Sequence, residues 1–131
     1  TFKPDFGNLP TENNLMWSTI SKLSKDYPFI VSSRTGKALH RILSMNFQNI
    51  HLITDSPKTL KLASLYRHNI TLHFNSKVTD ETPANLIYDY VKENKDSIFR
   101  KKSLALSTFV SRPFKGALAD NITFISKENI K

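Results

Sequence analysis

The sequence contains no cysteine, only three glycines and no long apolar run. The lack of cysteine excludes a disulfide framework, a thiolate zinc site and a cysteine nucleophile. Gly7, Gly36 and Gly116 stand far apart, so the chain has no glycine-rich loop of the kind that cradles phosphates. A membrane-spanning helix needs about 18 consecutive apolar residues. No apolar run approaches that length, and we expect no membrane span.

Residue sets that carry catalysis are also scarce. The histidines, His40, His51, His68 and His73, never occur at the spacing of a zinc-binding helix. His51 and His73 fall in predicted strands, where a structural role is the simpler interpretation. No serine stands in a strained nucleophile turn. We therefore expect no catalytic residues, no metal, no cofactor and no small-molecule substrate, in a protein that is not an enzyme.

Positive charge is in clear excess. The 131 residues include 19 Lys and Arg against 11 Asp and Glu, which gives a net charge of +8. Such a surface attracts nucleic acid, anionic lipid or phosphorylated protein segments, although the charge can also serve solubility alone. The basic run Arg100, Lys101 and Lys102 is a candidate nucleic-acid contact. Because no helix carries an evident set of base-reading side chains, such binding is expected to be weak and directed to backbone phosphates.

Hydrophobic spacing predicts an α/β fold in which short strands alternate with helices. Apolar residues recur at helical spacing between Thr11 and Pro28, with Trp17 at the edge of the apolar stripe. This alternation favours a small, mainly parallel β-sheet flanked by helices, with right-handed crossovers and an extra N-terminal helix. Strands are expected at residues 29–31, 50–53 and 70–74, helices starting near residues 37, 57 and 83, and further strands, one of them an antiparallel edge, at residues 104–110 and 122–125.

Two short segments form a candidate phosphate site. Ser32 and Ser33 follow the first predicted strand, and Lys58 and Lys61 lie one turn apart near the start of a later helix. In a parallel sheet, the carboxyl ends of strands and the amino ends of the following helices gather at one end. Hydroxyl and ammonium groups are donors that bind phosphate. The same residues also fit a turn and a solvated helix face.

The order of elements, the hydroxyl after the first strand and the step Thr59-Leu60-Lys61 at a helix start resemble a BRCT domain over residues 28–98. This family folds as a four-stranded parallel sheet flanked by helices. Its phosphopeptide-binding members hold phosphoserine or phosphothreonine with a Ser or Thr after the first strand and a Lys in the second helix. The resemblance gives these roles to Ser32, with Ser33 beside it, and to Lys61, while Lys58 would contact the peptide backbone.

The chain also departs from the family pattern. The segment between Gly36 and Ile50 is too short for the family's first helix and its usual second strand. The glycine pair after that helix is missing, and the tryptophan of the third helix is replaced in a region reading Leu86-Ile87-Tyr88-Asp89-Tyr90. The chain therefore resembles a single, divergent BRCT domain.

The lead-in helix with Trp17, the basic charge and the single divergent repeat further resemble the BRCT-like domain of heterochromatin-silencing scaffolds. The resemblance implies a nuclear interaction module that recruits phosphorylated nuclear proteins to silenced, telomeric chromatin. Trp17 and Arg34 are candidates for a partner surface, with a core position as the alternative for Trp17. The expected organisation is an extended lead-in at residues 1–10, a BRCT-like domain with its N-terminal helix at 11–98, and a basic C-terminal extension at 99–131.

Overall fold

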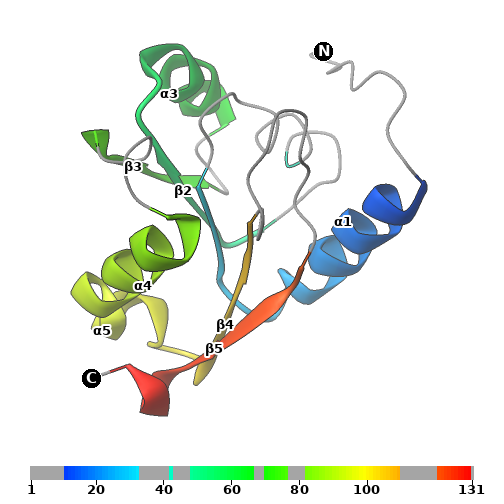
Figure 1. Cartoon of the computed structure of the whole chain (residues 1–131), viewed down its shortest axis with the longest axis vertical. Coiled ribbons are helices and arrows are strands. Elements are labelled where there is room, and N and C mark those ends of the chain that lie inside the picture. Colours follow the sequence, from blue (N-terminus) through cyan, green and yellow to red (C-terminus); the bar gives the residue numbers. More distant parts are fainter. Residues whose placement is uncertain are drawn as a thin grey trace.

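The computed structural model describes residues 11–32, 42, 48–66, 70–76, 82–109 and 121–130. These residues form one five-stranded sheet in the order β3-β2-β1-β4-β5, with helices on both faces (Figure 1). The strands β1 to β4 are parallel, and β5 is antiparallel to β4. The strands are β1 (Phe29–Ser32), β2 (Ile50–Thr54), β3 (Ile70–Phe74), β4 (Leu104–Thr108) and β5 (Thr123–Ser126). The helices are α1 (Thr11–Leu23), α3 (Pro57–Ala63), α4 (Pro83–Glu93) and α5 (Lys95–Ile98), with short 3-10 turns η1 (Ser64–Tyr66) and η3 (Lys127–Asn129).

This architecture confirms the predicted α/β class, and it is consistent with a BRCT-like fold. The expected strands near residues 104–110 and 122–125 are present, and β5 is an antiparallel edge strand. We expected β4 and β5 to belong to a C-terminal extension at residues 99–131. Both strands are part of the same sheet as β1. The lead-in at residues 1–10 lies outside the described residues. So does the helix expected from residue 37, except for Ile42, which is helical and buried.

Alternating side chains divide the core into two layers. Phe29 and Val31 of β1 face one side of the sheet, where they pack with α1 and with Ala63 of α3. Ile30 of β1 faces the other side, where α4, α5 and Ile130 cover it. We call these the first and second faces of the sheet. The parallel strands β1, β2 and β4 are therefore buried on both sides, as expected when helices form the crossovers, whereas the edge strand β3 is partly exposed.

The crossovers identify the place where the strand order reverses. Ile42 and α3, which follow β1 and β2, pack on the first face, whereas α4 and α5, which precede β4, pack on the second. From β1 the chain adds β2 and β3 on one side of the sheet, and from β4 it adds β5 on the other side. The strands β1 and β4 are neighbours, so the order reverses between them. In open α/β sheets, ligands bind outside the carboxyl ends of the two strands at such a reversal. Here those strands end at Ser32 and Thr108.

Helix starts follow the capping signals in the sequence. The Ser56 hydroxyl accepts a hydrogen bond from the backbone N–H of Thr59 at 3.2 Å, and Pro57 occupies the first turn of α3. Thr82 caps α4 in the same way, 3.4 Å from the N–H of Asn85. Such caps satisfy backbone donors that a helix leaves free at its start. Both helix starts therefore lie where the sequence predicts them.

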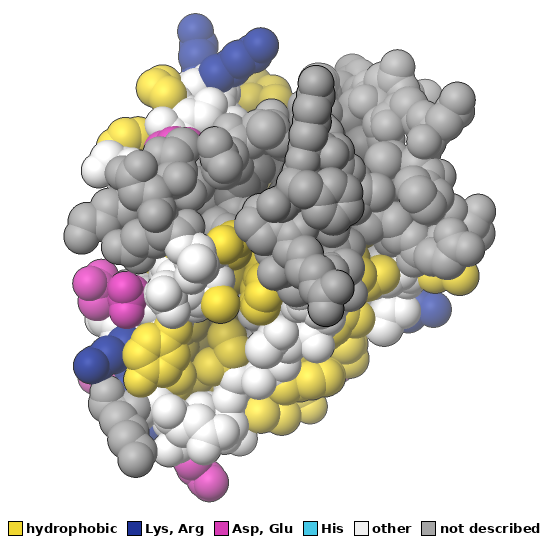
Figure 2. Space-filling view, in the orientation of Figure 1, with side chains coloured by type: hydrophobic (Ala, Val, Ile, Leu, Met, Phe, Trp, Pro, Cys, Tyr) yellow, Lys and Arg dark blue, Asp and Glu magenta, His cyan; other side chains and the backbone are white. Residues whose placement is uncertain are grey.

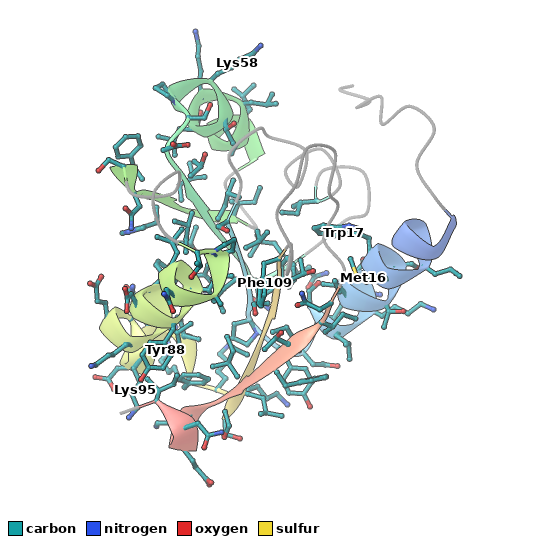
Figure 3. All side chains as sticks on the ribbon, in the orientation of Figure 1. Met16, Trp17, Lys58, Tyr88, Lys95 and Phe109 are labelled. Carbon is teal, nitrogen blue, oxygen red and sulfur yellow. The ribbon has the colours of Figure 1, made fainter. Side chains whose placement is uncertain are left out.

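Trp17 is a core residue. It is 4% exposed, and its ring lies edge-on to Phe29 with 6.1 Å between centroids. Figure 3 labels it on the sheet side of α1. The position at the margin of the helical stripe suggested that part of the indole is available to a partner. Packing against Phe29 buries that margin, so the partner-surface expectation for Trp17 is corrected to a core role.

Candidate functional site

The carboxyl end of the sheet is built around the last residues of β1 and β2. Ser32 ends β1, is half-buried and stands in register with Ile53 of β2. Thr54 ends β2 and is fully buried, and its hydroxyl accepts a hydrogen bond from the N–H of Ser56 at 3.1 Å. This hydrogen bond turns the chain directly from β2 into α3. The end of β1 and the start of α3 therefore lie at the same end of the sheet, as the sequence predicts.

The two lysines of the predicted site lie on the outer side of α3. Thr59 and Ala63 form the buried side of this helix, whereas Lys58 and Lys61 are exposed. Figure 2 shows basic side chains projecting from the surface over α3, and in Figure 3 the Lys58 side chain extends away from the sheet. Lys61 is held at its backbone, where its carbonyl accepts a 2.7 Å hydrogen bond from the Ser64 hydroxyl. Its ammonium group remains in solvent.

Ser32 and α3 approach this end of the sheet from different faces. By strand alternation Ser32 shares the second face with Ile30, whereas α3 packs on the first face through Ala63. A ligand that contacts both the Ser32 hydroxyl and the Lys61 ammonium must therefore lie across the end of the sheet. Ser33 and Arg34, the other predicted residues in this region, lie outside the described residues.

The carboxyl end of β4, next to Ser32, is fixed by hydrogen bonds to the segment that enters β5. The Thr108 hydroxyl donates to the backbone carbonyl of Asn121, and the Asn121 side-chain amide donates to the carbonyl of Phe109 at 2.9 Å. Thr108 is buried. These two hydrogen bonds join the end of β4 to the start of β5 beside Ser32. The sequence offered no signal for this connection beyond the polar residues that end β4.

His51, His73 and Tyr90 form a polar cluster on the second face. The sequence analysis gave the two histidines a structural role. The Nδ1 atom of His51 lies 2.7 Å from the Tyr90 hydroxyl, and the rings of His51 and His73 both meet Tyr90 edge-on, at 5.7 and 5.1 Å. Burial lowers the pKa of His51 and raises the pKa of Tyr90 to about 12. Burial disfavours the charged form of each group, so both are neutral at pH 7. His51 and Tyr90 can therefore share a hydrogen bond but supply no charge.

The basic run lies at the opposite, amino end of the sheet. Arg100, Lys101 and Lys102 follow α5 and are exposed, and they line a cavity of about 330 Å³ together with the starts of β2 and β3. The structure thus separates the two groups of predicted site residues, with Ser32 and Lys61 at one end of the parallel strands and the basic run at the other. Within the described ranges, no cluster of three or more His, Asp or Glu side chains is suited to a metal ion.

Comparison with protein-family models and with curated proteins gives no match to this chain. Among the helices of the described residues, none has both the length and the apolar character that crossing a membrane requires.

Proposed function

We propose that this domain is a non-catalytic interaction module that binds phosphoserine or phosphothreonine segments of partner proteins across the carboxyl end of its sheet. The observation that carries the proposal is the position of Ser32. It ends β1 where the strand order reverses, and α3 with Lys58 and Lys61 begins at the same end of the sheet. This is the place where open α/β sheets bind ligands. The BRCT resemblance assigns the phosphate to the same residues.

The chemistry of these groups suits a phosphate. A phosphorylated serine carries about −1.5 to −2 charges at neutral pH and several strong acceptor oxygens. The Ser32 hydroxyl offers one neutral donor, and the exposed Lys61 ammonium offers a charge on a stem long enough to lean over the sheet. Lys58 lies one turn earlier on the same outer side of α3 and would contact the peptide beside the phosphate.

The cellular role that we propose rests on the resemblance alone. In a heterochromatin scaffold, a module of this kind would recruit phosphorylated nuclear proteins to silenced, telomeric chromatin and so contribute to transcriptional repression. A reversible phosphate is well suited to that purpose, because its addition creates the charge that the site recognises and its removal abolishes it.

The test compares paired peptides. We expect an arrayed set of phosphoserine and phosphothreonine peptides to contain binders whose unphosphorylated counterparts do not bind. For such a peptide, Lys61→Met should weaken binding by about tenfold or more, because a charge-assisted hydrogen bond contributes roughly 1.5–3 kcal/mol. Ser32→Ala should weaken it less, since it removes a neutral donor. The unphosphorylated peptide should bind neither variant, as it does not bind the parent protein.

Lys92→Met is the matched control. Lys92 is exposed on α4 and belongs to neither group of predicted site residues. Its replacement by methionine therefore removes the same charge as Lys61→Met without changing the proposed site. We expect this variant to bind as the parent protein does. Both lysine variants should melt as the parent does, because Lys61 and Lys92 are exposed. A Lys61→Met protein with unchanged affinity for every phosphorylated peptide would refute the assignment. An equal loss in the Lys92→Met protein would show that only net charge matters.

A further inference from the structure

The cavity at the amino end of the sheet is assembled from four separate parts of the chain. It is lined by Asp26 and Pro28 after α1, Gln48, Asn49, Ile50 and His51 at β2, Ile70 and Thr71 at β3, and Ser97, Ile98, Arg100, Lys101 and Lys102 after α4. Its three isoleucines are buried in the core, Ile50 and Ile70 on the first face and Ile98 on the second, so the accessible lining is mainly polar. Pockets for small organic ligands are lined mainly by apolar side chains. The cavity therefore suits a hydrophilic ligand.

The positive charge of the lining is concentrated in one segment. Arg100, Lys101 and Lys102 are consecutive and exposed, and the lining sets one carboxylate, that of Asp26, against them. Nearby segments carry cations and carboxylates in equal number, namely Lys25 with Asp26, Lys95 with Asp96 and Lys127 with Glu128. The excess positive charge at this end of the sheet therefore comes from Arg100–Lys102.

Exposed polar side chains at this end follow the order of the strands. Thr71 lies at the start of β3, Asn49 directly precedes β2, and Lys102 lies two residues before β4. Lys127 directly follows the antiparallel strand β5, and its backbone N–H donates to the carbonyl of Ser103 at 2.9 Å. Figure 1 shows the start of β4 and the end of β5 together at the lower end of the sheet. Because neighbouring strands lie about 4.8 Å apart, this row of side chains spans roughly 19 Å.

Contacts within the fold hold Asn49 and Lys102 in place. The Asn49 side-chain amide donates to the carbonyl of Ser24 at 3.2 Å, and its own carbonyl accepts from the N–H of Phe29 at 2.9 Å. The Lys102 ammonium lies 5.7 Å from the centre of the Tyr27 ring, within the range of a cation–π contact. Both residues are therefore tied to the segment that leads from α1 into β1.

We propose that the amino end of the sheet binds the sugar-phosphate backbone of duplex DNA, at a surface separate from the peptide site. Proteins contact DNA phosphates with Arg and Lys together with Ser, Thr, Asn and Gln side chains. The cavity presents this combination, in Arg100, Lys101 and Lys102 with Gln48, Asn49, Thr71 and Ser97. One DNA strand rises about 3.4 Å per phosphate, so the row of roughly 19 Å faces about five phosphates. A phosphodiester backbone uses both the cations and the neutral donors, whereas an anionic lipid surface needs only the cations.

The first experiment measures the salt dependence of DNA binding. A fluorescent duplex of about 20 base pairs is titrated with the domain between about 50 and 200 mM salt, and fluorescence anisotropy reports the complex. Three phosphate contacts by Arg100–Lys102 predict that the logarithm of the association constant falls with the logarithm of the salt concentration with a slope of about −2.7. A duplex of unrelated sequence should bind within about twofold, because backbone contacts carry no sequence information. A slope near zero, or a strong preference for one sequence, would overturn the proposal.

Two double variants with the same loss of charge locate the DNA. Arg100→Gln with Lys101→Gln should weaken binding at least about tenfold at low salt and reduce the slope to about −0.9. Lys58→Gln with Lys61→Gln is the matched control, because these exposed lysines lie on α3 at the opposite end of the sheet. It should leave the slope unchanged and the affinity for DNA within about twofold. If both double variants lose affinity equally, only net charge matters and the assignment is wrong.

Ser97→Glu tests whether the DNA backbone reaches the cavity. The variant places a carboxylate among the lining residues and should weaken DNA binding at least about threefold by repulsion of the phosphates. Asn85→Glu adds the same charge at an exposed position in the first turn of α4 and should change the affinity by less than about twofold. A Ser97→Glu protein that binds DNA like the parent would show that the backbone does not reach the cavity, and the proposal would be wrong.

Two other polyanions serve as competitors of the labelled duplex. Poly-glutamate and vesicles of phosphatidylserine with phosphatidylcholine are added at the same concentration of negative charge as unlabelled DNA. Each should compete at least about tenfold less well, because duplex DNA places one charge about every 1.7 Å along its axis. If poly-glutamate competes as well as DNA, the surface recognises negative charge in general. If the vesicles do so, it recognises a membrane, and either result contradicts the proposal.

Discussion

Replacing Trp17 by alanine tests whether this residue is part of the core. The side chain is 4% exposed and belongs to the buried cluster on the first face, where it meets Phe29 edge-on. Removal of a buried tryptophan costs about 3–5 kcal/mol. Domains of this kind are stable by roughly 5–15 kcal/mol in total. We therefore expect Trp17→Ala to lose a large share of the folding free energy and to approach the limit of stability.

Urea unfolding followed by circular dichroism measures this loss. With a dependence of about 2 kcal/mol per molar urea, the midpoint should fall by roughly 1.5–2.5 M. Leu15→Ala is the control, because Leu15 lies on the same helix and is 64% exposed. It should change stability by no more than about 0.5 kcal/mol. A Trp17→Ala protein that unfolds like the parent but no longer binds phosphorylated peptides would refute the core assignment and restore the partner surface.

The remaining predictions concern the second face. Burial lowers the pKa of His51, so this residue takes up a proton at higher pH in the unfolded chain than in the folded one. The free energy of unfolding should therefore decline below about pH 6.5, with a slope of at most about 1.4 kcal/mol per pH unit. Urea unfolding between pH 8 and 5 measures this decline, which should be smaller in His51→Gln. Burial raises the pKa of Tyr90 to about 12, so stability should also fall as pH rises above 10, which the phenolate absorbance during alkaline unfolding reports. The buried Ser107 hydroxyl has no hydrogen-bond partner among the described residues, so Ser107→Ala should raise stability by about 1 kcal/mol in thermal unfolding, and a comparable loss would contradict this reasoning.

The strands and helix starts between residues 29 and 91 could be predicted because their signals are local. Period-two alternation at Ile70, Leu72 and Phe74 marks β3, and a hydroxyl followed by proline marks the starts of α3 and α4. These patterns reflect backbone hydrogen bonding within a few residues of the chain. The carboxyl end of the sheet follows from them, because parallel strands fix where the following helices begin.

The strand at residues 104–110 was expected, but its place beside β1 in the sheet could not be predicted in the same way. β4 pairs with residues 29–31 of β1, more than seventy positions earlier in the chain, and this pairing has no local signal. The polar residues Ser107 and Thr108 weaken its apolar pattern even though both are buried. The cavity was missed for a similar reason, because four separate segments form it and only Arg100–Lys102 stands out in the sequence.

The Lys61 end of the sheet and the basic run Arg100–Lys102 lie at opposite ends of the same parallel strands, and this arrangement predicts that they act independently. The first and last residues of β1 are about 10 Å apart, which exceeds the screening length of roughly 8 Å at physiological salt. Charges on the basic run should therefore have little electrostatic effect on a phosphate beside Lys61. We expect Arg100→Gln with Lys101→Gln to change the affinity for a phosphorylated peptide by less than about twofold. If this double variant instead weakens peptide binding as much as Lys61→Met does, both groups act as one basic surface, and the assignment of the phosphate to the Lys61 end is wrong.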